Sequence, residues 1–286
     1  MELVIWTDGR FVTAEEPALS AVDHGFTVGD GVFETCAVYD GEAFALTRHL
    51  ARLARSAHGL GITAPDEAIV RDAVRSVLDR AGSTVGRLRI TVTAGAGPLG
   101  SARGDGPVTL LVAAGPTPPA KPSRVVRLPW IRNERSAVAG LKTTSYAENV
   151  VGLAYATARG ADEGLLANTV GALCEGTASN VLVERDGELL TPVLETGCLA
   201  GITRELLLEW AAQEGLPVRE ATPDELPFTV LDDVLAGHGA LALALAGSIR
   251  NVSPVVSLDG VDLVPGHLSV AAQELFARRV RDGIDP

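Results

Sequence analysis

The chain has 286 residues, of which 47% are hydrophobic and 21% charged, and its 36 acidic and 24 basic residues give a net charge of −12. This is ordinary globular composition, and at about 100 to 200 residues per domain the length favours two domains. The acidic balance is a poor footprint for nucleic-acid binding, no apolar run reaches the roughly 18 residues of a membrane span, and the start shows no secretory signal. We therefore expect a cytoplasmic protein with a small-molecule ligand and neither a nucleic-acid nor a membrane partner.

The first 115 residues are expected to form an α+β domain. Alternating apolar residues and the turn signals Asp8-Gly9 and Asp40-Gly41 indicate strands, whereas apolar residues every three or four positions with arginines between them indicate helices. The predicted elements are strands over 3–11, 32–38 and 43–46, helices over 46–59 and 65–81, and strands over 86–94 and 108–114.

A proline-rich segment is expected to separate this domain from a second one. Four prolines lie within nine residues, GPTPPAKPS, so residues 116–123 are predicted to be a stiff linker. Residues 124–286 are predicted to be an α/β domain. Its expected elements are a strand over 124–128, a helix over 145–159, strands over 165–169, 181–184 and 188–190, and helices over 203–213 and 268–281.

The cysteines and histidines do not indicate a metal site or a disulfide framework. Cys36, Cys174 and Cys198 are an odd number without CxxC or Cys/His ligand spacing, and no histidines have metal-ligand spacing. A G-x-S-x-G motif is also missing from the sequence. Metalloenzyme and serine hydrolase functions are therefore disfavoured, and we expect no metal.

The two lysines are the most informative part of the composition. Only Lys121 and Lys142 are lysines, and the other basic residues are arginines. A position that needs an amine able to lose its proton and attack a carbonyl cannot use a guanidinium. Lys121 lies in the proline-rich linker and is expected to be a solvated charge. Lys142 follows apolar and small residues, where desolvation favours nucleophilic or base chemistry, and it is the candidate catalytic residue.

Three other features fit the same chemistry. Glu175 lies between apolar and small residues and is expected to be partly buried, where a carboxylate needs a cationic partner. Gly201-Ile202-Thr203 opens a predicted helix whose N–H groups can bind an anion, although an ordinary N-cap at Thr203 also explains it. Arg52 and Ser248 can add donors to that anion. An amine, a carboxylate and an anion cradle together are what pyridoxal 5′-phosphate (PLP) requires.

The sequence resembles the class IV aminotransferase family, the fold-type IV PLP-dependent enzymes, over essentially its whole length. The segments that carry the resemblance are GDGVFETCAVYDG (29–41), RHLARL (48–53), LKTTSY (141–146), CEGTASNVLVERDGELLTP (174–192), CLAGITREL (198–206) and GSIRNVSPV (247–255). One departure is Leu182, where the family usually has Phe or Tyr. The resemblance implies the D-amino acid aminotransferase-like fold, with the cofactor between two α/β domains, and a homodimer.

The resemblance also implies the roles of individual residues. Lys142 is then the Schiff-base lysine, and Glu175 is the partner of the pyridine nitrogen. The implied phosphate contacts are Arg52, Ile202, Thr203, Gly247 and Ser248. Tyr146 is expected near the cofactor, and Leu199 is expected to pack on its ring. The implied substrate-binding residues are Phe33, Ile249 and Arg250.

Within the family, the sequence looks most like the 4-amino-4-deoxychorismate lyases, which release pyruvate and 4-aminobenzoate on the route to folate. The compact length, the FET of GVFETCAVYDG and the SIRNVSPV block carry this likeness. The alternative is an aminotransferase acting on a branched-chain amino acid, a D-amino acid or an (R)-amine. A third hypothesis is a catalytically silent small-molecule binder on the same scaffold.

Overall fold

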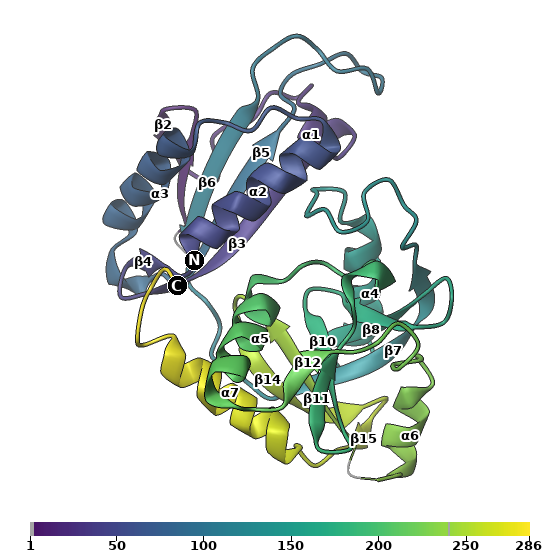
Figure 1. Cartoon of the computed structure of the whole chain (residues 1–286). Helices are drawn as coiled ribbons and strands as arrows, with labels where there is room; N and C mark the ends of the chain where they lie inside the picture. The colour runs from purple at the N-terminus through teal and green to yellow at the C-terminus, as the bar shows by residue number, and fades with distance from the viewer. Residues whose placement is uncertain (1–2, 240) are drawn as a thin grey trace. The chain divides into compact units, whose positions relative to one another are not determined.

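The chain divides into two compact units in its computed structural model, which describes residues 3–239 and 241–286 (Figure 1). Unit 1 comprises Met1–Pro119, Leu141–Tyr146 and Gly283–Pro286, and unit 2 comprises Ala120–Gly140 and Ala147–Asp282. The first break, after Pro119, falls inside the predicted linker over 116–123.

Two short segments of the predicted second domain, residues 124–286, belong to unit 1 instead. Leu141–Tyr146 belongs to unit 1 because its backbone pairs with a strand there: Phe33 N–H donates to the Lys142 carbonyl at 3.0 Å, and Thr144 N–H donates to the Gly31 carbonyl at 2.7 Å. Gly283–Pro286 also belongs to unit 1, where Ala45 N–H donates to the Ile284 carbonyl at 2.7 Å. The candidate lysine therefore belongs to the first unit.

Unit 1 contains a six-stranded sheet in the order β2-β1-β6-β5-β3-β4. The strands are β1 (Val4–Thr7), β2 (Arg10–Val12), β3 (Gly31–Tyr39), β4 (Glu42–Ala43), β5 (Arg87–Thr93) and β6 (Thr109–Gly115). The helices are α1 (His24–Thr27), α2 (Leu46–Leu60) and α3 (Glu67–Ala81), followed by the 3₁₀ turn η1 (Gly82–Thr84). The predicted turn between β1 and β2 is confirmed, since Asp8 and Gly9 have φ of 42° and 90°, as a two-residue hairpin turn requires.

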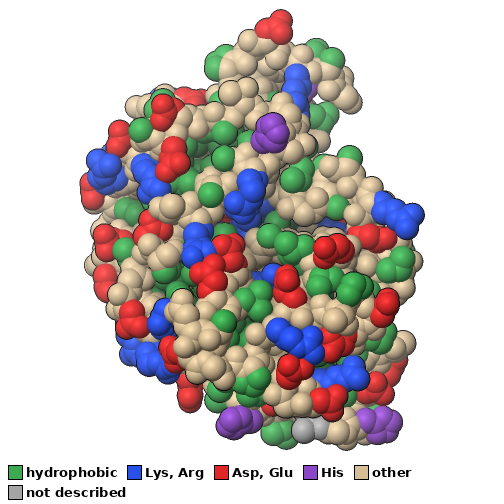
Figure 2. All heavy atoms as spheres, in the orientation of Figure 1, with side chains coloured by type: hydrophobic (Ala, Val, Ile, Leu, Met, Phe, Trp, Pro, Cys, Tyr) green, Lys and Arg blue, Asp and Glu red, His purple; other side chains and the backbone are tan. Residues whose placement is uncertain are grey.

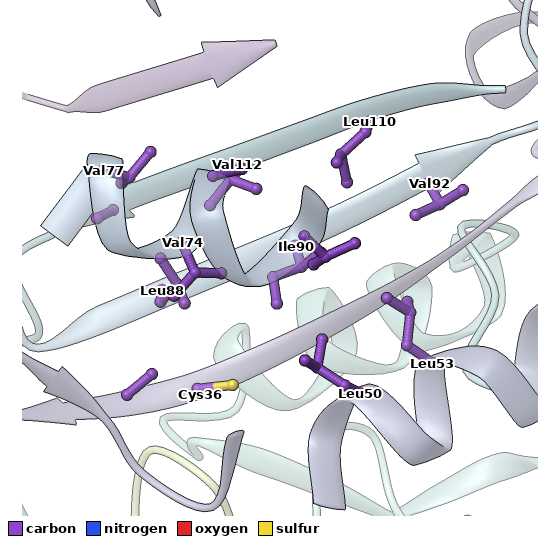
Figure 3. Packing of buried hydrophobic residues seen from close by; sticks show 14 of the residues in the cluster. Cys36, Leu50, Leu53, Val74, Val77, Leu88, Ile90, Val92, Leu110 and Val112 are labelled. Atoms are coloured by element: carbon purple, nitrogen blue, oxygen red, sulfur yellow. The ribbon is translucent and has the colours of Figure 1, made fainter. Parts of the chain in front are cut away.

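Helices α2 and α3 pack on the same face of this sheet. Figure 3 shows Leu50 and Leu53 of α2 and Val74 of α3 pointing toward the buried side chains of β5, such as Leu88 and Ile90. Because side chains alternate along a strand, the residues between those of β5 lie on the other face of the sheet. The core therefore takes one face and leaves the other available for polar groups.

Unit 2 contains a nine-stranded sheet whose main path is β12-β11-β10-β13-β14-β7-β8-β9, with β15 paired to β14. The strands are β7 (Ser123–Arg132), β8 (Glu163–Asn168), β9 (Leu173–Gly176), β10 (Asn180–Arg185), β11 (Glu188–Thr191), β12 (Val218–Glu220), β13 (Ala242–Gly247), β14 (Asn251–Leu258) and β15 (Val261–Asp262). The helices are α4 (Ala147–Thr157), α5 (Ile202–Glu214), α6 (Val230–Ala236) and α7 (His267–Arg279), with the 3₁₀ turn η2 (Leu194–Thr196).

Several strands of unit 2 are buried, and helices pack against its sheet. β8 is buried along its whole length, β10 is buried except at its last residue, and β13 is a nearly continuous apolar run, which is typical of strands covered on both faces. α4 covers β7 and β8, where Ala156 packs with Leu128 and Leu166. On α5 and α7, Trp210 and Phe276 contact each other with ring centroids 4.9 Å apart. The predicted helices over 145–159, 203–213 and 268–281 are confirmed with ends shifted by a few residues.

The surface carries both signs of charge. Figure 2 shows Lys and Arg side chains scattered among Asp and Glu on the visible face. Among the residues that the structure describes, no helix combines the length and the apolar character needed to cross a bilayer.

Candidate active site

The backbone of Lys142 is held on two sides within unit 1. Its carbonyl accepts a hydrogen bond from Phe33 N–H of β3 at 3.0 Å, and its own N–H donates to Ser56 Oγ of α2 at 3.2 Å. Val32 and Thr143 form the isolated bridge between these segments. The lysine is half-buried. These contacts fix where its amine can reach.

Two aromatic rings surround that amine. Lys142 Nζ lies 4.4 Å from the ring centroid of Phe33 and 5.6 Å from that of Tyr146. The two rings contact each other edge to face, with centroids 5.1 Å apart. Both distances from Nζ are within the range of a cation–π contact. The structure thus brings together three residues that the sequence assigned to the site.

Arg89 adds a second cation to the same ring. It lies on β5 between Leu88 and Ile90, whose side chains face the core, so its guanidinium is on the opposite face of the sheet. There its Cζ lies 3.7 Å from the ring centroid of Phe33, and its Nε donates to Thr91 Oγ1 at 3.2 Å. Sequence reasoning missed Arg89, because the pairing of β5 beside β3 is needed to place it next to Lys142.

A buried ionic cluster lies on the helix-facing side of β3. Glu34 is 0% exposed, and its carboxylate accepts from Arg52 Nε and NH2, both at 2.7 Å. His49 Nδ1 lies 2.6 Å from Glu34 Oε2. Arg52, predicted as a phosphate ligand, is thus held in a two-pronged ion pair within unit 1. The sequence pointed to Arg52 but gave no role to His49 or Glu34.

This pairing determines the charge of Glu34. Burial alone would raise the pKa of the carboxyl, but the charge and hydrogen bonds of Arg52, with those of His49, hold the pKa well below its usual range. Desolvation lowers the pKa of Arg52, but the charge of Glu34 and its hydrogen bonds to Arg52 raise it, so the net shift is upward. Both groups therefore stay charged at neutral pH.

In unit 2, Glu175 lies at β9 with both carboxylate oxygens next to donors. Oε2 accepts from Leu199 N–H at 2.9 Å, and Oε1 lies 3.4 Å from Arg132 Nε. Arg132 ends β7, and its NH1 donates to Glu148 Oε2 at 2.6 Å. The side chain of Glu175 is 12% exposed, so the predicted partial burial is confirmed. Arg132 was missed, since nothing in the sequence aligns the end of β7 with β9.

The start of α5 has the features of an anion site. The N-cap is Gly201, which has no side chain to cap the first N–H groups, so the alternative of an N-cap at Thr203 is wrong. Ile202 and Thr203 are buried in the first turn. A Cβ on Gly201 would come within 1.9 Å of Asn180 Oδ1, so only glycine lets this helix end approach β10. Backbone N–H groups at such an end favour a phosphate.

A hairpin turn between β13 and β14 lies next to residues 178–180, at the start of β10. Residues 248–250 connect β13 to β14, and Asn251 has a φ of 55°, as in three-residue hairpin loops. A Cβ on Gly247 would lie 3.5 Å from the Ala178 carbonyl and 3.6 Å from Ser179 Cβ. The start of α5 and this turn, with Ser248 and Ile249, therefore both adjoin residues 178–180.

Arg250 of this turn contacts other protein groups. Its NH2 pairs with Glu163 Oε2, and its NH1 donates to Ser123 Oγ at 2.9 Å. Its predicted role is binding of a substrate carboxylate, and these contacts show that both terminal nitrogens have partners inside unit 2.

The sequence matches a known protein family along most of its length. Residues 31–258 match the model described as Amino-transferase class IV. The chain belongs to this family. It is a PLP-dependent enzyme of fold type IV, with the predicted two-domain α/β architecture of branched-chain and D-amino acid aminotransferases.

Three curated relatives illustrate the range of activities. A Methanocaldococcus jannaschii protein assigned provisionally as a branched-chain-amino-acid aminotransferase is 33% identical over 264 residues, covering 90% of this chain and 88% of that one. A D-alanine aminotransferase of Bacillus licheniformis is 30% identical, covering 93% of each chain. An aminodeoxychorismate lyase of Bacillus subtilis is 28% identical, covering 87% of this chain and 96% of that one.

A solved structure gives the same assignment. The PLP-bound form of a hypothetical aminotransferase from Mycobacterium tuberculosis is 28% identical and superposes with a TM-score of 0.82, covering 98% of this chain and all of that one.

The residues of this chain fit PLP. Lys142 supplies an amine beside aromatic rings in unit 1. In unit 2, Glu175 offers a carboxylate held by a backbone N–H, and the start of α5, whose N-cap Gly201 has no side chain, offers backbone N–H groups for a phosphate. An amine, a carboxylate and an anion cradle are the donor set that this cofactor needs.

Proposed function

We propose that the protein is an aminotransferase that acts on an α-amino acid. The observation that carries the proposal is the pair of cations on the ring of Phe33, the amine of Lys142 and the guanidinium of Arg89. An α-amino acid presents an amine and a carboxylate on one carbon, and a guanidinium is the side chain best suited to a carboxylate. Arg89 therefore binds the substrate carboxylate while the substrate amine approaches the position of Lys142.

When bound, the cofactor supplies an aldehyde for the amine and a ring that accepts the electron pair of a broken bond. Lys142, as the proposed Schiff-base lysine, would hold the cofactor through its amine and would carry the proton to and from the amine-bearing carbon of the substrate. Positioned proton transfer of this kind contributes typically about 10² to 10⁴-fold. Tyr146, whose ring faces the amine, orients it.

Other residues hold the cofactor. Glu175 keeps a proton on the pyridine nitrogen, and the hydrogen bond from Leu199 N–H fixes the direction of its carboxylate. Leu199 packs on the ring. The proposed phosphate contacts are Ile202, Thr203, Gly247, Ser248 and Arg52. The proposed apolar contacts to substrate are Phe33 and Ile249.

The lyase is the second candidate. It is supported by the relative in Bacillus subtilis and by the likeness of the SIRNVSPV block to lyases. The aminotransferase has more support among the relatives described above. A homodimer, which the family resemblance implies, is proposed for either activity and is tested by light scattering of the holoenzyme.

One assay panel distinguishes the two activities. The holoenzyme is incubated with branched-chain L-amino acids, D-alanine or an (R)-amine, each with pyruvate or 2-oxoglutarate, and separately with aminodeoxychorismate. Amino transfer from an α-amino acid is expected. Release of pyruvate and 4-aminobenzoate without amino transfer would contradict the proposal and favour the lyase. Inactivity toward every substrate would favour a silent binder.

A further inference from the structure

Glu163 is a buried carboxylate to which the proposed reaction gives no role. It begins β8, and its side chain is 1% exposed. Oε1 accepts from Thr177 Oγ1 at 3.0 Å and from the backbone N–H of Ala178, while Oε2 pairs with Arg250 NH2. A buried carboxylate is tolerated only when donors satisfy both oxygens, and here each oxygen has one or more.

These donors come from two separate loops. Thr177 and Ala178 belong to the loop 177–179 between β9 and β10, whereas Arg250 belongs to the turn 248–250 between β13 and β14. Arg250 NH1 also donates to Ser123 Oγ, which lies 2.9 Å from Ser253 Oγ of β14. The side-chain bonds of Glu163 therefore link the two loops to each other.

The approach of the loops depends on glycines. A Cβ on Gly176 would lie 2.9 Å from Glu163 Oε1, so a side chain there would displace the carboxylate. Gly247 adjoins Ala178 and Ser179 directly. The carboxylate thus helps to hold the turn that contains Ser248 beside the loop 177–179.

We propose that Glu163 and Arg250 are positioning residues for the phosphate of the cofactor. Their ion pair fixes the turn 248–250 so that the backbone and hydroxyl of Ser248 are already placed when the phosphate arrives. A preordered loop binds more tightly because it loses less conformational freedom on binding. The inference rests on the proposed phosphate role of Gly247 and Ser248, and it replaces the substrate role predicted for Arg250.

Comparing the binding of PLP with that of pyridoxal separates an effect on phosphate binding from an effect on general stability. Pyridoxal has the aldehyde and ring of the cofactor but lacks the phosphate. A residue that only supports the fold weakens the binding of both compounds, whereas one that orders the phosphate turn weakens that of PLP alone. The ratio of the two dissociation constants therefore reports the positioning role.

The test uses the full-length apo-protein and four variants. Glu163→Gln and Arg250→Met break the ion pair, Arg250→Lys keeps the positive charge, and Arg127→Met is the matched control. Arg127 pairs with Asp232 and Asp259 elsewhere in unit 2, so its loss removes similar contacts without touching either loop. Each protein is titrated with PLP and with pyridoxal, and its thermal unfolding is recorded.

For Glu163→Gln and Arg250→Met, we expect the Kd for PLP to rise roughly tenfold, as for a lost hydrogen bond to a charged group, while the Kd for pyridoxal stays within about twofold. Arg250→Lys should recover part of the loss, and Arg127→Met should match the wild type. An equal rise for both ligands with a lower unfolding temperature, or unchanged Kd values, would overturn the inference. Wild-type protein that does not bind PLP would instead overturn the proposed function, and with it this inference.

Discussion

The guanidinium of Arg52 and the carboxylate of Glu34 form a two-pronged ion pair inside unit 1, with Nε–Oε1 and NH2–Oε2 distances of 2.7 Å. Arg52 sits on α2 and Glu34 on β3, so the pair fastens the helix to the strand that also pairs with the Lys142 segment. The ion pair with Glu34 therefore sets the orientation of Arg52, a proposed phosphate ligand.

Removal of that carboxylate should destabilise the protein strongly. Glu34→Gln leaves the Arg52 charge buried without its counterion, which typically costs about 3–5 kcal/mol. The free energy of unfolding is measured by denaturant titration, with Glu67→Gln as the control. Glu67 pairs with Arg71 on the surface of α3, where such a loss is worth about 0–1 kcal/mol. Equal stability of the two variants would contradict a structural role of the buried pair.

The same pair predicts an acid-dependent component of stability. Because the pKa of Glu34 is lower in the folded than in the unfolded protein, the unfolded chain binds the proton more readily as the pH falls. The stabilisation is complete above the usual glutamate pKa of about 4.3 and is lost progressively below it. Denaturation at a series of pH values should therefore show a smaller acid loss in Glu34→Gln than in the wild type. Parallel curves would exclude this group as a contributor.

Substitution of Arg89 should affect substrates according to their carboxylate. In Arg89→Met, kcat/KM for α-amino acids should fall roughly ten- to a hundredfold, the range expected for one charge-assisted hydrogen-bonded contact. Turnover of an amine without a carboxylate should change little. Arg87→Met, two residues away on β5, is the matched control. If both classes of substrate lost activity equally, Arg89 would not be the carboxylate ligand.

Glu175 and Arg132 should differ in the size of their effects. Glu175→Gln should retain the bound cofactor but lose far more activity than occupancy, because a neutral amide holds the ring proton weakly. Arg132→Met removes the cation 3.4 Å from Oε1 but leaves the Glu175 carboxylate in place, so a loss of about tenfold in kcat is expected, with recovery in Arg132→Lys. Visible absorbance gives the occupancy. Glu148→Gln, which changes only the other partner of Arg132, should remain near wild type.

A side chain at the start of α5 should impair phosphate binding. In Gly201→Ala the new Cβ would come within 1.9 Å of Asn180 Oδ1, so the helix end or Asn180 must move. We expect the Kd for PLP to rise several-fold, measured by titration of the apo-protein. Gly100→Ala is the control, since a Cβ there meets no atom within 4 Å. Unchanged affinity in Gly201→Ala would show that this helix end does not bind the phosphate.

Local sequence patterns predicted the elements and part of the site. The spacing of Leu50 and Leu53 between arginines indicated α2, and the scarcity of lysine singled out Lys142. Both signals lie within a short stretch of chain, where helical periodicity and side-chain chemistry can be read directly.

Pairings between distant segments could not be read in this way. Glu34 and Arg52 meet only because α2 packs on β3, and Glu163 meets Arg250 across 87 positions of sequence. In the sequence, Arg89 cannot be told apart from any other arginine on a strand. Its place near Lys142 becomes visible only when β5 pairs with β3. Such contacts depend on sheet order, which a single sequence does not specify.

The most direct test of the account is the site of covalent cofactor attachment. The holoenzyme is reduced with borohydride and digested, and the peptides are analysed by mass spectrometry. The chain provides its own control, because Lys121, the other lysine of the sequence, lies in the linker and pairs with Asp162. We expect a pyridoxyl group on Lys142 alone. A label on Lys121, or no label on a holoenzyme that turns over amino acids, would contradict it.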